Sequence, residues 1–275
     1  MSGQTGLYNA EHISTFYDAY ATREWDRLVS TPAEAVSFYI HTHYLKRFVT
    51  KGARVLEAGA GPGRFTIELA KLGAAIIVGD ISQVQLNLNA QHVAEAGFEE
   101  QVEARVRLDI TDLSGFEDNS FDAVVCYGGP VSYVLERGEQ AVSELLRVLK
   151  PDGYLLLSVM SLLGATRAFF EGVVSHERFP DVVDEVNADG ILTSENNKGH
   201  AFKFYRAQEL KGLLEHAGAS VEGLSASNFL SVGHEALPQD EHWHKVLEWE
   251  LEYCAESGAV DSGTHIVAVA KKLKV

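Results

Sequence analysis

A glycine-rich turn with an acid on each side is the part of this sequence best suited to chemistry. Residues 55–63 read VLEAGAGPG, so a short apolar run ends at Glu57 and is followed by glycines at 59, 61 and 63. These glycines let the backbone approach a ligand, because no Cβ stands in the way. The next apolar run, 74–79, ends at Asp80, whose carboxylate can accept hydrogen bonds from both hydroxyls of a ribose. The order predicts a β-loop-α-β unit that binds an adenosine-containing ligand.

The residues of the turn separate two classes of adenosine ligand. A dinucleotide fold favours G-x-G-x-x-G and places a pyrophosphate at the helix N-terminus, whereas this chain has Gly59-x-Gly61-Pro62-Gly63. Glu57 would repel a pyrophosphate but suits a ligand that carries an ammonium group. S-adenosylmethionine (SAM) carries an ammonium and a sulfonium, so SAM is the cofactor that we expect.

Four segments resemble the motifs of class I SAM-dependent methyltransferases of the small-molecule type. Residues 57–65, EAGAGPGRF, resemble the first motif, and Asp80, Asp109 and 121–130 follow in the same order and spacing. The resemblance extends from about Phe16 to Val159 and is only architectural from residue 160 onward. It implies an α/β fold with a doubly wound, mostly parallel seven-stranded sheet and an antiparallel last strand. It also implies an N-terminal helical cap and an insertion after strand five.

The pattern of apolar runs alternates strands and helices, which favours a parallel sheet with helices on both faces. We expect one helix over 8–30, a second from Pro32 to Phe48, a helix cap at Ser82 and a turn at 150–153. Residues 161–204 have no regular period. We therefore expect one domain, 1–275, made of a helical cap (1–50), a SAM-binding core (51–160), an insertion or lid (161–204) and the C-terminal half of the sheet (205–275).

Charge and composition narrow the choice of partners. The formal net charge is −16 and there is no long basic stretch, so nucleic acid and anionic membranes are disfavoured and a small-molecule acceptor is expected. No run of 18 apolar residues is present, and the first residues have no signal-peptide pattern. The two cysteines are too few for a disulfide framework. We expect a cytoplasmic protein, and the sequence does not indicate an oligomeric state.

The candidate cofactor-binding residues come from the turn, the strand ends and the cap. The resemblance places Ile81 on the adenine, Asp109 and Ile110 at its amino group and ring face, and the end of 121–130 beside the transferring methyl group. Each also has a structural interpretation, such as a helix cap, a turn acid or a helical packing stripe. The full set is Tyr17, Tyr20, Glu57, Gly59, Ala60, Gly61, Gly63, Asp80, Ile81, Asp109, Ile110, Tyr127 and Gly128.

No catalytic residue is defined by a motif. The candidates are Tyr17, Tyr127, His176, His200 and His234, and a surface or packing role is favoured for any single histidine. We expect no metal site: the two histidine pairs 41/43 and 242/244 are spaced i, i+2, which does not share a helix face, and no Cys/His ligand spacing occurs.

These patterns predict an enzyme that transfers a methyl group from SAM to a nitrogen, oxygen or sulfur atom of a small molecule by in-line displacement. Two alternatives remain. One is a nucleotide-dependent oxidoreductase, against which Glu57 and Pro62 argue. The other is a SAM-binding protein without catalysis.

Overall fold

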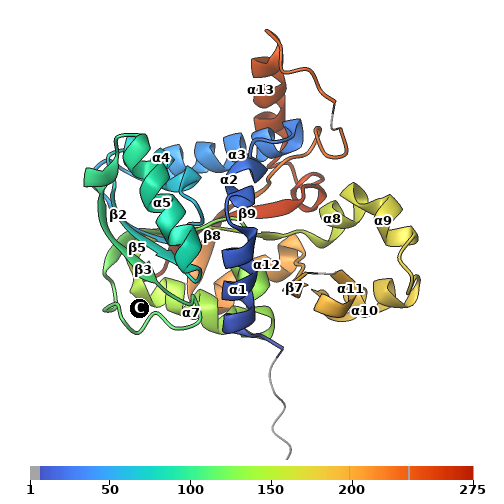
Figure 1. Cartoon of the computed structure of the whole chain (residues 1–275), viewed down its shortest axis with the longest axis horizontal. Coiled ribbons are helices and arrows are strands. Elements are labelled where there is room, and N and C mark those ends of the chain that lie inside the picture. Colours follow the sequence, from blue (N-terminus) through green and yellow to red (C-terminus); the bar gives the residue numbers. More distant parts are fainter. Residues whose placement is uncertain (1–6, 198, 235, 275) are drawn as a thin grey trace, which may run out of the picture.

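A seven-stranded sheet forms the centre of the chain in the computed structural model, which describes residues 7–197, 199–234 and 236–274 (Figure 1). The strand order is β3-β2-β1-β4-β5-β9-β8. Strands β1 to β5 pair in parallel, whereas β9 is antiparallel to both β5 and β8. The predicted fold class is confirmed. The bounds are β1 (Arg54–Ala58), β2 (Ala75–Asp80), β3 (Val102–Arg107), β4 (Phe121–Cys126), β5 (Leu149–Met160), β8 (Ala219–Ala226) and β9 (His265–Lys272).

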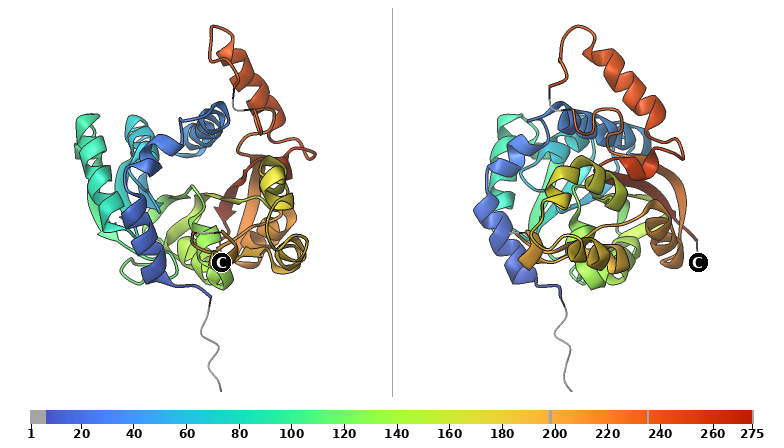
Figure 2. Two further views of the ribbon diagram at one scale, coloured as in Figure 1. Left: turned by 45° about the vertical axis from the view of Figure 1, so that its right-hand side comes forward. Right: turned by 90° about the vertical axis from the view of Figure 1, so that its right-hand side faces the viewer.

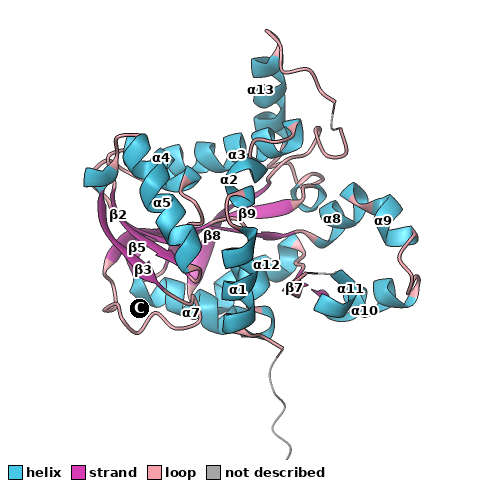
Figure 3. Ribbon diagram, viewed as in Figure 1, coloured by secondary structure: helices cyan, strands magenta, loops and turns pink. Residues whose placement is uncertain are grey.

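Helices cover both faces of the sheet because the central strands are apolar on both sides. Neighbouring residues such as Val55 and Leu56, or Val124 and Val125, enter opposite core clusters, as the two-residue period of a strand requires. One cluster includes α3 (Pro32–Phe48), α4 (Arg64–Lys71), α5 (Gln83–Glu95) and α13 (Trp243–Tyr253). The other includes α6 (Pro130–Tyr133), α7 (Gly138–Val148) and α12 (Ala207–His216), of which Figure 3 labels α7 and α12.

Two helices begin where the sequence predicts them. Pro32 stands at the first turn of α3, and the Thr31 side chain accepts a hydrogen bond from the Glu34 amide at 3.3 Å. Ser82 caps α5 by accepting from the Gln85 amide at 3.1 Å. The second cap fixes the start of α5 directly after Asp80 and so helps to position that carboxylate.

Two predicted elements are corrected by the structure. The single helix over 8–30 is two helices, α1 (Ala10–Tyr20) and α2 (Arg23–Arg27), because the chain turns at Ala21 with φ of 48°. The turn at 150–153 lies inside β5, where the register shifts between Phe121 and Ala123 of β4. Asp152, with φ of 64°, supplies the local kink that turn residues predicted, and the strand continues past it as a bulge.

Residues 161–204 contain regular structure that the sequence did not predict. They form α8 (Leu162–Ala168), α9 (Phe170–Val174), α10 (Asp181–Asp189) and α11 (Ser194–Asn197), with a two-stranded sheet of β6 (Ile191–Leu192) and β7 (Phe202–Lys203). These elements, yellow in Figure 2, lie beside the main sheet. The segment leaves and rejoins the core at one place, because Ser161 forms a β-bridge with Tyr205.

Three short 3₁₀ turns complete the connections, at Glu99–Gln101, Leu135–Arg137 and Val260–Ser262. Within the described ranges, every helix falls short of the length and apolar character needed to cross a membrane.

A buried carboxylate holds the loop that follows β8. Glu250 of α13 is fully buried, and its oxygens accept hydrogen bonds from the amides of Phe229, Leu230 and Ser231 at 2.6–3.1 Å. Glu250→Ala leaves these donors without a partner, so we expect the free energy of unfolding to fall by about 3 kcal/mol. Urea denaturation measures the change. The control is Glu252→Ala, an exposed position on the same helix, and equal effects of the two variants would contradict the role given to Glu250.

Candidate functional site

The glycine turn and Asp80 form one hydrogen-bonded unit at the carboxyl ends of β1 and β2. The Gly61 amide donates to Asp80 Oδ2 at 2.8 Å, and the Ser82 amide donates to Oδ1 at 2.9 Å. Gly59, Gly61 and Gly63 have φ of 80°, 54° and 104°, a region that glycine adopts without strain. Burial raises the pKa of Asp80 to about 6, against the effect of the two amides. The carboxyl is therefore oriented by the backbone and ionised above that pH.

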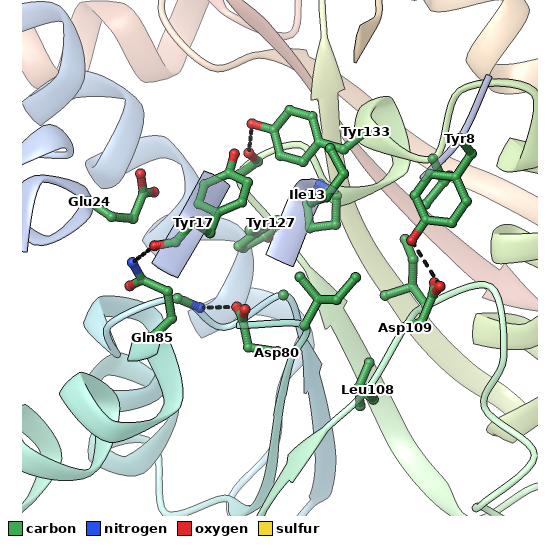
Figure 4. Close-up of a pocket in the computed structure, with 17 residues that line it drawn as sticks. Tyr8, Ile13, Tyr17, Glu24, Asp80, Gln85, Leu108, Asp109, Tyr127 and Tyr133 are labelled. Atoms are coloured by element: carbon green, nitrogen blue, oxygen red, sulfur yellow. Dashed lines mark hydrogen bonds between the residues drawn. The ribbon is translucent and has the colours of Figure 1, made fainter. Parts of the chain in front are cut away.

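A cavity of about 80 Å³ opens between this unit and the N-terminal helices (Figure 4). Its floor comes from the turns after β1 and β4 and from the ends of β2 and β3, and its roof comes from α1, α2 and the residues before them. The lining residues are Tyr8, Ile13, Tyr17, Glu24, Gly59, Gly61, Asp80, Ile81, Gln85, Leu108, Asp109, Ile110, Tyr127, Gly128, Pro130, Tyr133 and Val134.

The cavity brings together nine of the predicted cofactor-binding residues. These are Tyr17, Gly59, Gly61, Asp80, Ile81, Asp109, Ile110, Tyr127 and Gly128. Tyr20, Glu57, Ala60 and Gly63 do not belong to the lining. Tyr20 lines a neighbouring cavity, and Gly63 is the N-cap residue just before α4. Among the lining residues, Ile81, Leu108 and Ile110 give one wall an apolar surface.

Glu57 lies behind the glycine turn. Its side chain is buried and accepts a hydrogen bond from Thr66 Oγ1 of α4 at 2.6 Å. Asn89 of α5 donates in turn to Thr66 Oγ1 at 2.8 Å. Burial raises the pKa of Glu57 to about 8. In this arrangement Glu57 joins β1 to α4 and α5, rather than presenting its carboxylate to the cavity.

The roof of the cavity contains residues that the sequence analysis did not place in the site. The Tyr8 hydroxyl donates to Asp109 Oδ2 at 2.9 Å, and Gln85 Nε2 donates to the carbonyls of Tyr17 and Ala21 at 3.1 and 3.0 Å. These bonds fasten the N-terminal segment across the strand ends. The i, i+4 spacing of Ile13 and Tyr17, which places them on one face of α1, is the signal that could have indicated this roof.

A second cavity of about 470 Å³ adjoins the first, and Tyr17, Glu24 and Tyr133 line both. Arg27 faces it in an ion pair with Glu24, with Nε 2.9 Å from Oε2. The other polar side chains of its lining include Ser37, His200, Asn228, His234, Thr264 and His265. Burial lowers the pKa of His265 to about 3, so this imidazole is neutral. No motif marks His265, which is the first residue of β9.

His200 is the candidate base with the most favourable surroundings. Its ring packs against Phe16 and Tyr133, both with centroids 4.6 Å away, and it faces the second cavity. Nδ1 lies 2.9 Å from the Ala201 carbonyl oxygen. Because a carbonyl only accepts, Nδ1 carries the proton and Nε2 has a free lone pair. Burial lowers the pKa of His200, which keeps the ring neutral near pH 7.

The structure gives the other candidates different positions. Both His176 nitrogens have local partners, Nε2 the Asn196 carbonyl and Nδ1 the Arg178 amide, and the residue lines a third cavity. His234 is exposed at the second cavity. The Tyr127 hydroxyl is buried without a hydrogen-bond partner among the described residues, and burial raises its pKa well above the usual value. In those same residues no group of three or more His, Cys, Asp or Glu side chains could hold a metal ion.

Comparisons with known proteins agree with this arrangement. Residues 56–157 match the family model described as a methyltransferase domain. A Geobacillus protein named as a methyltransferase is 32% identical over 154 residues, which cover 54% of this chain and only 60% of that protein. The ubiquinone biosynthesis O-methyltransferase of Xanthomonas axonopodis pv. citri is 28% identical over 213 residues, covering 76% of this chain and 80% of the relative.

Solved structures share the fold. The [4+2]-cyclase SpnF superimposes with a TM-score of 0.64 at 19% identity, covering 98% of this chain and 100% of that chain. A SAM-dependent methyltransferase from Methanosarcina mazei gives a TM-score of 0.58 at 17% identity, covering 84% and 98%. At these identities the likeness concerns the fold alone.

The glycine turn offers a stability test with a matched control. Gly59 and Gly97 have almost equal φ, 80° and 79°, but a Cβ on Gly59 would collide with the Pro130 ring, whereas nothing lies within 4 Å of a Cβ on Gly97. We expect Gly97→Ala to cost about 1 kcal/mol through its positive φ. Gly59→Ala should cost a further 1–3 kcal/mol or so, because of the collision. Chemical denaturation of both variants measures the difference, and equal losses would show that Pro130 does not confine the turn.

Proposed function

We propose that this chain, which matches a methyltransferase domain over residues 56–157 and has the seven-stranded fold of its structural neighbours, transfers the methyl group of SAM to a nitrogen, oxygen or sulfur atom of a small molecule. One observation carries the proposal. The cavity that contains the glycine turn and Asp80 adjoins a larger cavity through Tyr17, Glu24 and Tyr133. A donor and an acceptor bound in adjoining cavities can be held close together and aligned for direct transfer.

The residues of the first cavity suit SAM. Asp80 offers a carboxylate held by two backbone amides, and its remaining lone pairs can accept from the ribose hydroxyls. Ile81, Leu108 and Ile110 offer an apolar wall for the adenine. The Tyr17 ring stands on the side of the second cavity, where an aromatic face favours a cation, and the Glu24 carboxylate beside it is paired with Arg27. When bound, SAM supplies an activated methyl group.

The N-terminal segment has to move when the cofactor enters. A cavity of about 80 Å³ is smaller than the 300–1,000 Å³ or so of ordinary ligand pockets. Its roof is held by side-chain hydrogen bonds such as those of Tyr8 and Gln85 and by side-chain packing such as that of Ile13 and Tyr17. We therefore assign α1 and α2 a closing role: they open to admit the cofactor and exclude water once it is bound.

In the second cavity we give His200 the role of general base for an acceptor that must lose a proton. The His200 ring lines this cavity beside Tyr17 and Tyr133, two residues common to both cavities. The base removes the proton while the acceptor atom bonds to the methyl group. An acceptor that is already deprotonated, or an amine, needs no such help.

Direct assays separate methyl transfer from binding of SAM without catalysis. Release of S-adenosylhomocysteine from SAM in the presence of small-molecule extracts, with a matching methylated product in the mass spectrum, is the expected result. Binding of SAM without any turnover across such extracts would favour a protein that binds SAM without methyl transfer. The family match at residues 56–157 already favours both over an oxidoreductase.

Asp80→Asn tests the cofactor site. The amide keeps the size of the side chain but removes its charge, and its NH2 group replaces one of the two oxygens that accept from the Gly61 and Ser82 amides, so we expect SAM to bind about 10- to 100-fold more weakly by calorimetry. In the parent protein, SAM affinity should fall as the pH drops through about 6, because the Asp80 carboxyl becomes protonated, whereas Asp80→Asn should show no such step. Glu100→Gln, an exposed carboxyl-to-amide change, is the control. Unchanged affinity in Asp80→Asn would remove this residue from the site.

His200→Gln tests the base. With a hydroxyl or thiol acceptor found in the screen, we expect kcat to fall about 100-fold or more while SAM affinity stays the same. In the parent enzyme the acid limb of the kcat profile should lie below the ordinary histidine pKa of 6.5, because burial lowers the pKa of His200. The exposed His242→Gln is the matched control. An unchanged kcat in His200→Gln would show that a group other than His200 removes the proton.

A further inference from the structure

A third cavity, of about 520 Å³, lies inside the 161–204 segment. It is formed mainly by α8, α9, α10 and the β6–β7 pair and is open to solvent on one side, and side chains such as Leu162, Val173, Val182, Val186 and Phe204 line it. Protein interiors are packed as densely as organic crystals, with few voids larger than a water molecule. A cavity of this size, within the usual range for ligand pockets, therefore has the dimensions of a binding site rather than of a packing defect.

The chemistry of the lining favours hydrocarbon. Most lining side chains are aliphatic or phenylalanine. Four of its five polar side chains have partners in the protein, among them Asn197, which donates to the His200 carbonyl at 3.1 Å, and the fifth, Asn187, is exposed. The Thr166 hydroxyl donates to the Leu162 carbonyl at 2.7 Å. His176 has partners at both ring nitrogens, and Asn196 Oδ1 accepts from Arg178 at 3.2 Å. Ordered water needs two to four polar partners, which such walls do not offer.

The third cavity continues into the second, where we place the acceptor. Met160, at the end of β5, and Ala165 and Phe169, on and after α8, line both. Phe169 is 65% exposed, so its ring is accessible where the two cavities meet. A molecule that extends from the second cavity past these residues passes from polar walls with several histidines to apolar walls.

We propose that the acceptor is amphipathic: its reactive polar head lies in the second cavity and a hydrocarbon tail fills the third. The proposal rests on the proposed function for the identity of the head, and it adds the substrate class. The tail provides binding free energy away from the reacting atom and so fixes the head beside the cofactor. Residues of the 161–204 segment then determine which acceptors bind, while the core binds the cofactor.

The test is a series of 4-alkylphenols with ethyl, butyl, hexyl and octyl chains, titrated by calorimetry into the full-length protein with and without S-adenosylhomocysteine. Each methylene buried in an apolar cavity should raise affinity about fourfold until the cavity is full. Hydrogen exchange with the octyl compound should protect α10 and the β6–β7 pair. Affinity that does not increase with chain length, or protection confined to other elements, would overturn the proposal.

A matched pair of variants locates the tail. Val183→Trp adds bulk at a lining position of α10, whereas Asp184→Trp adds the same side chain at the next, exposed position. We expect Val183→Trp to abolish the gain with chain length and to leave ethylphenol and SAM binding unchanged, and Asp184→Trp to behave as the parent. Val186→Phe serves as a second lining variant should Val183→Trp not fold.

Equal behaviour of the lining and exposed variants would place the tail elsewhere and overturn the proposal. The result is independent of the cofactor site, because chain-length dependence is measured by binding alone. Loss of SAM binding or of turnover would count against the proposed function, whereas a flat chain-length series would count against the tail site only.

Discussion

The carboxylate of Asp80 holds together the two segments on which the cofactor site depends. It accepts one hydrogen bond from the glycine turn after β1 and one from the start of α5, so two loops from different strands share a single acceptor. Neither amide has a partner in a helix or strand at these positions, and an unpaired buried amide is costly. The geometry of the turn therefore follows from the place where β2 ends, which is set by the register of β1 and β2.

The roof of the site has a different physical basis from its floor. The floor consists of backbone turns fixed by the sheet, whereas the roof is joined to it by side chains, as in the contacts of Tyr8 with Asp109 and of Gln85 with Tyr17. Such bonds contribute on the order of 1 kcal/mol each and can exchange with water. A rigid floor and a roof whose contacts can open suit a site that must bind a ligand, enclose it and release it.

Sequence patterns predicted the elements that depend on local order. Apolar runs identified the core strands, Pro32 and Ser82 identified helix starts, and the acid after an apolar run identified Asp80. Contacts between distant residues were not predictable in this way: Tyr8 lies 101 positions from Asp109, and no periodicity connects them. The same is true of His265, and of the β6–β7 pair, whose two-residue strands are too short to show alternation. Glu57 shows a further limit, because its type suggested a ligand contact while its position between β1 and α4 gives it a partner in Thr66.

The β-bridge between Ser161 and Tyr205 allows the 161–204 segment to vary independently of the sheet. Backbone bonds join the two ends of the 161–204 segment, with the Leu162 amide donating to the Tyr205 carbonyl and the Tyr205 amide to the Met160 carbonyl. The segment is thus a closed excursion from the sheet, and lengthening it adds little loop-closure entropy because its ends are already held together. A change in the length or sequence of this segment therefore leaves the register of the strands on either side unchanged.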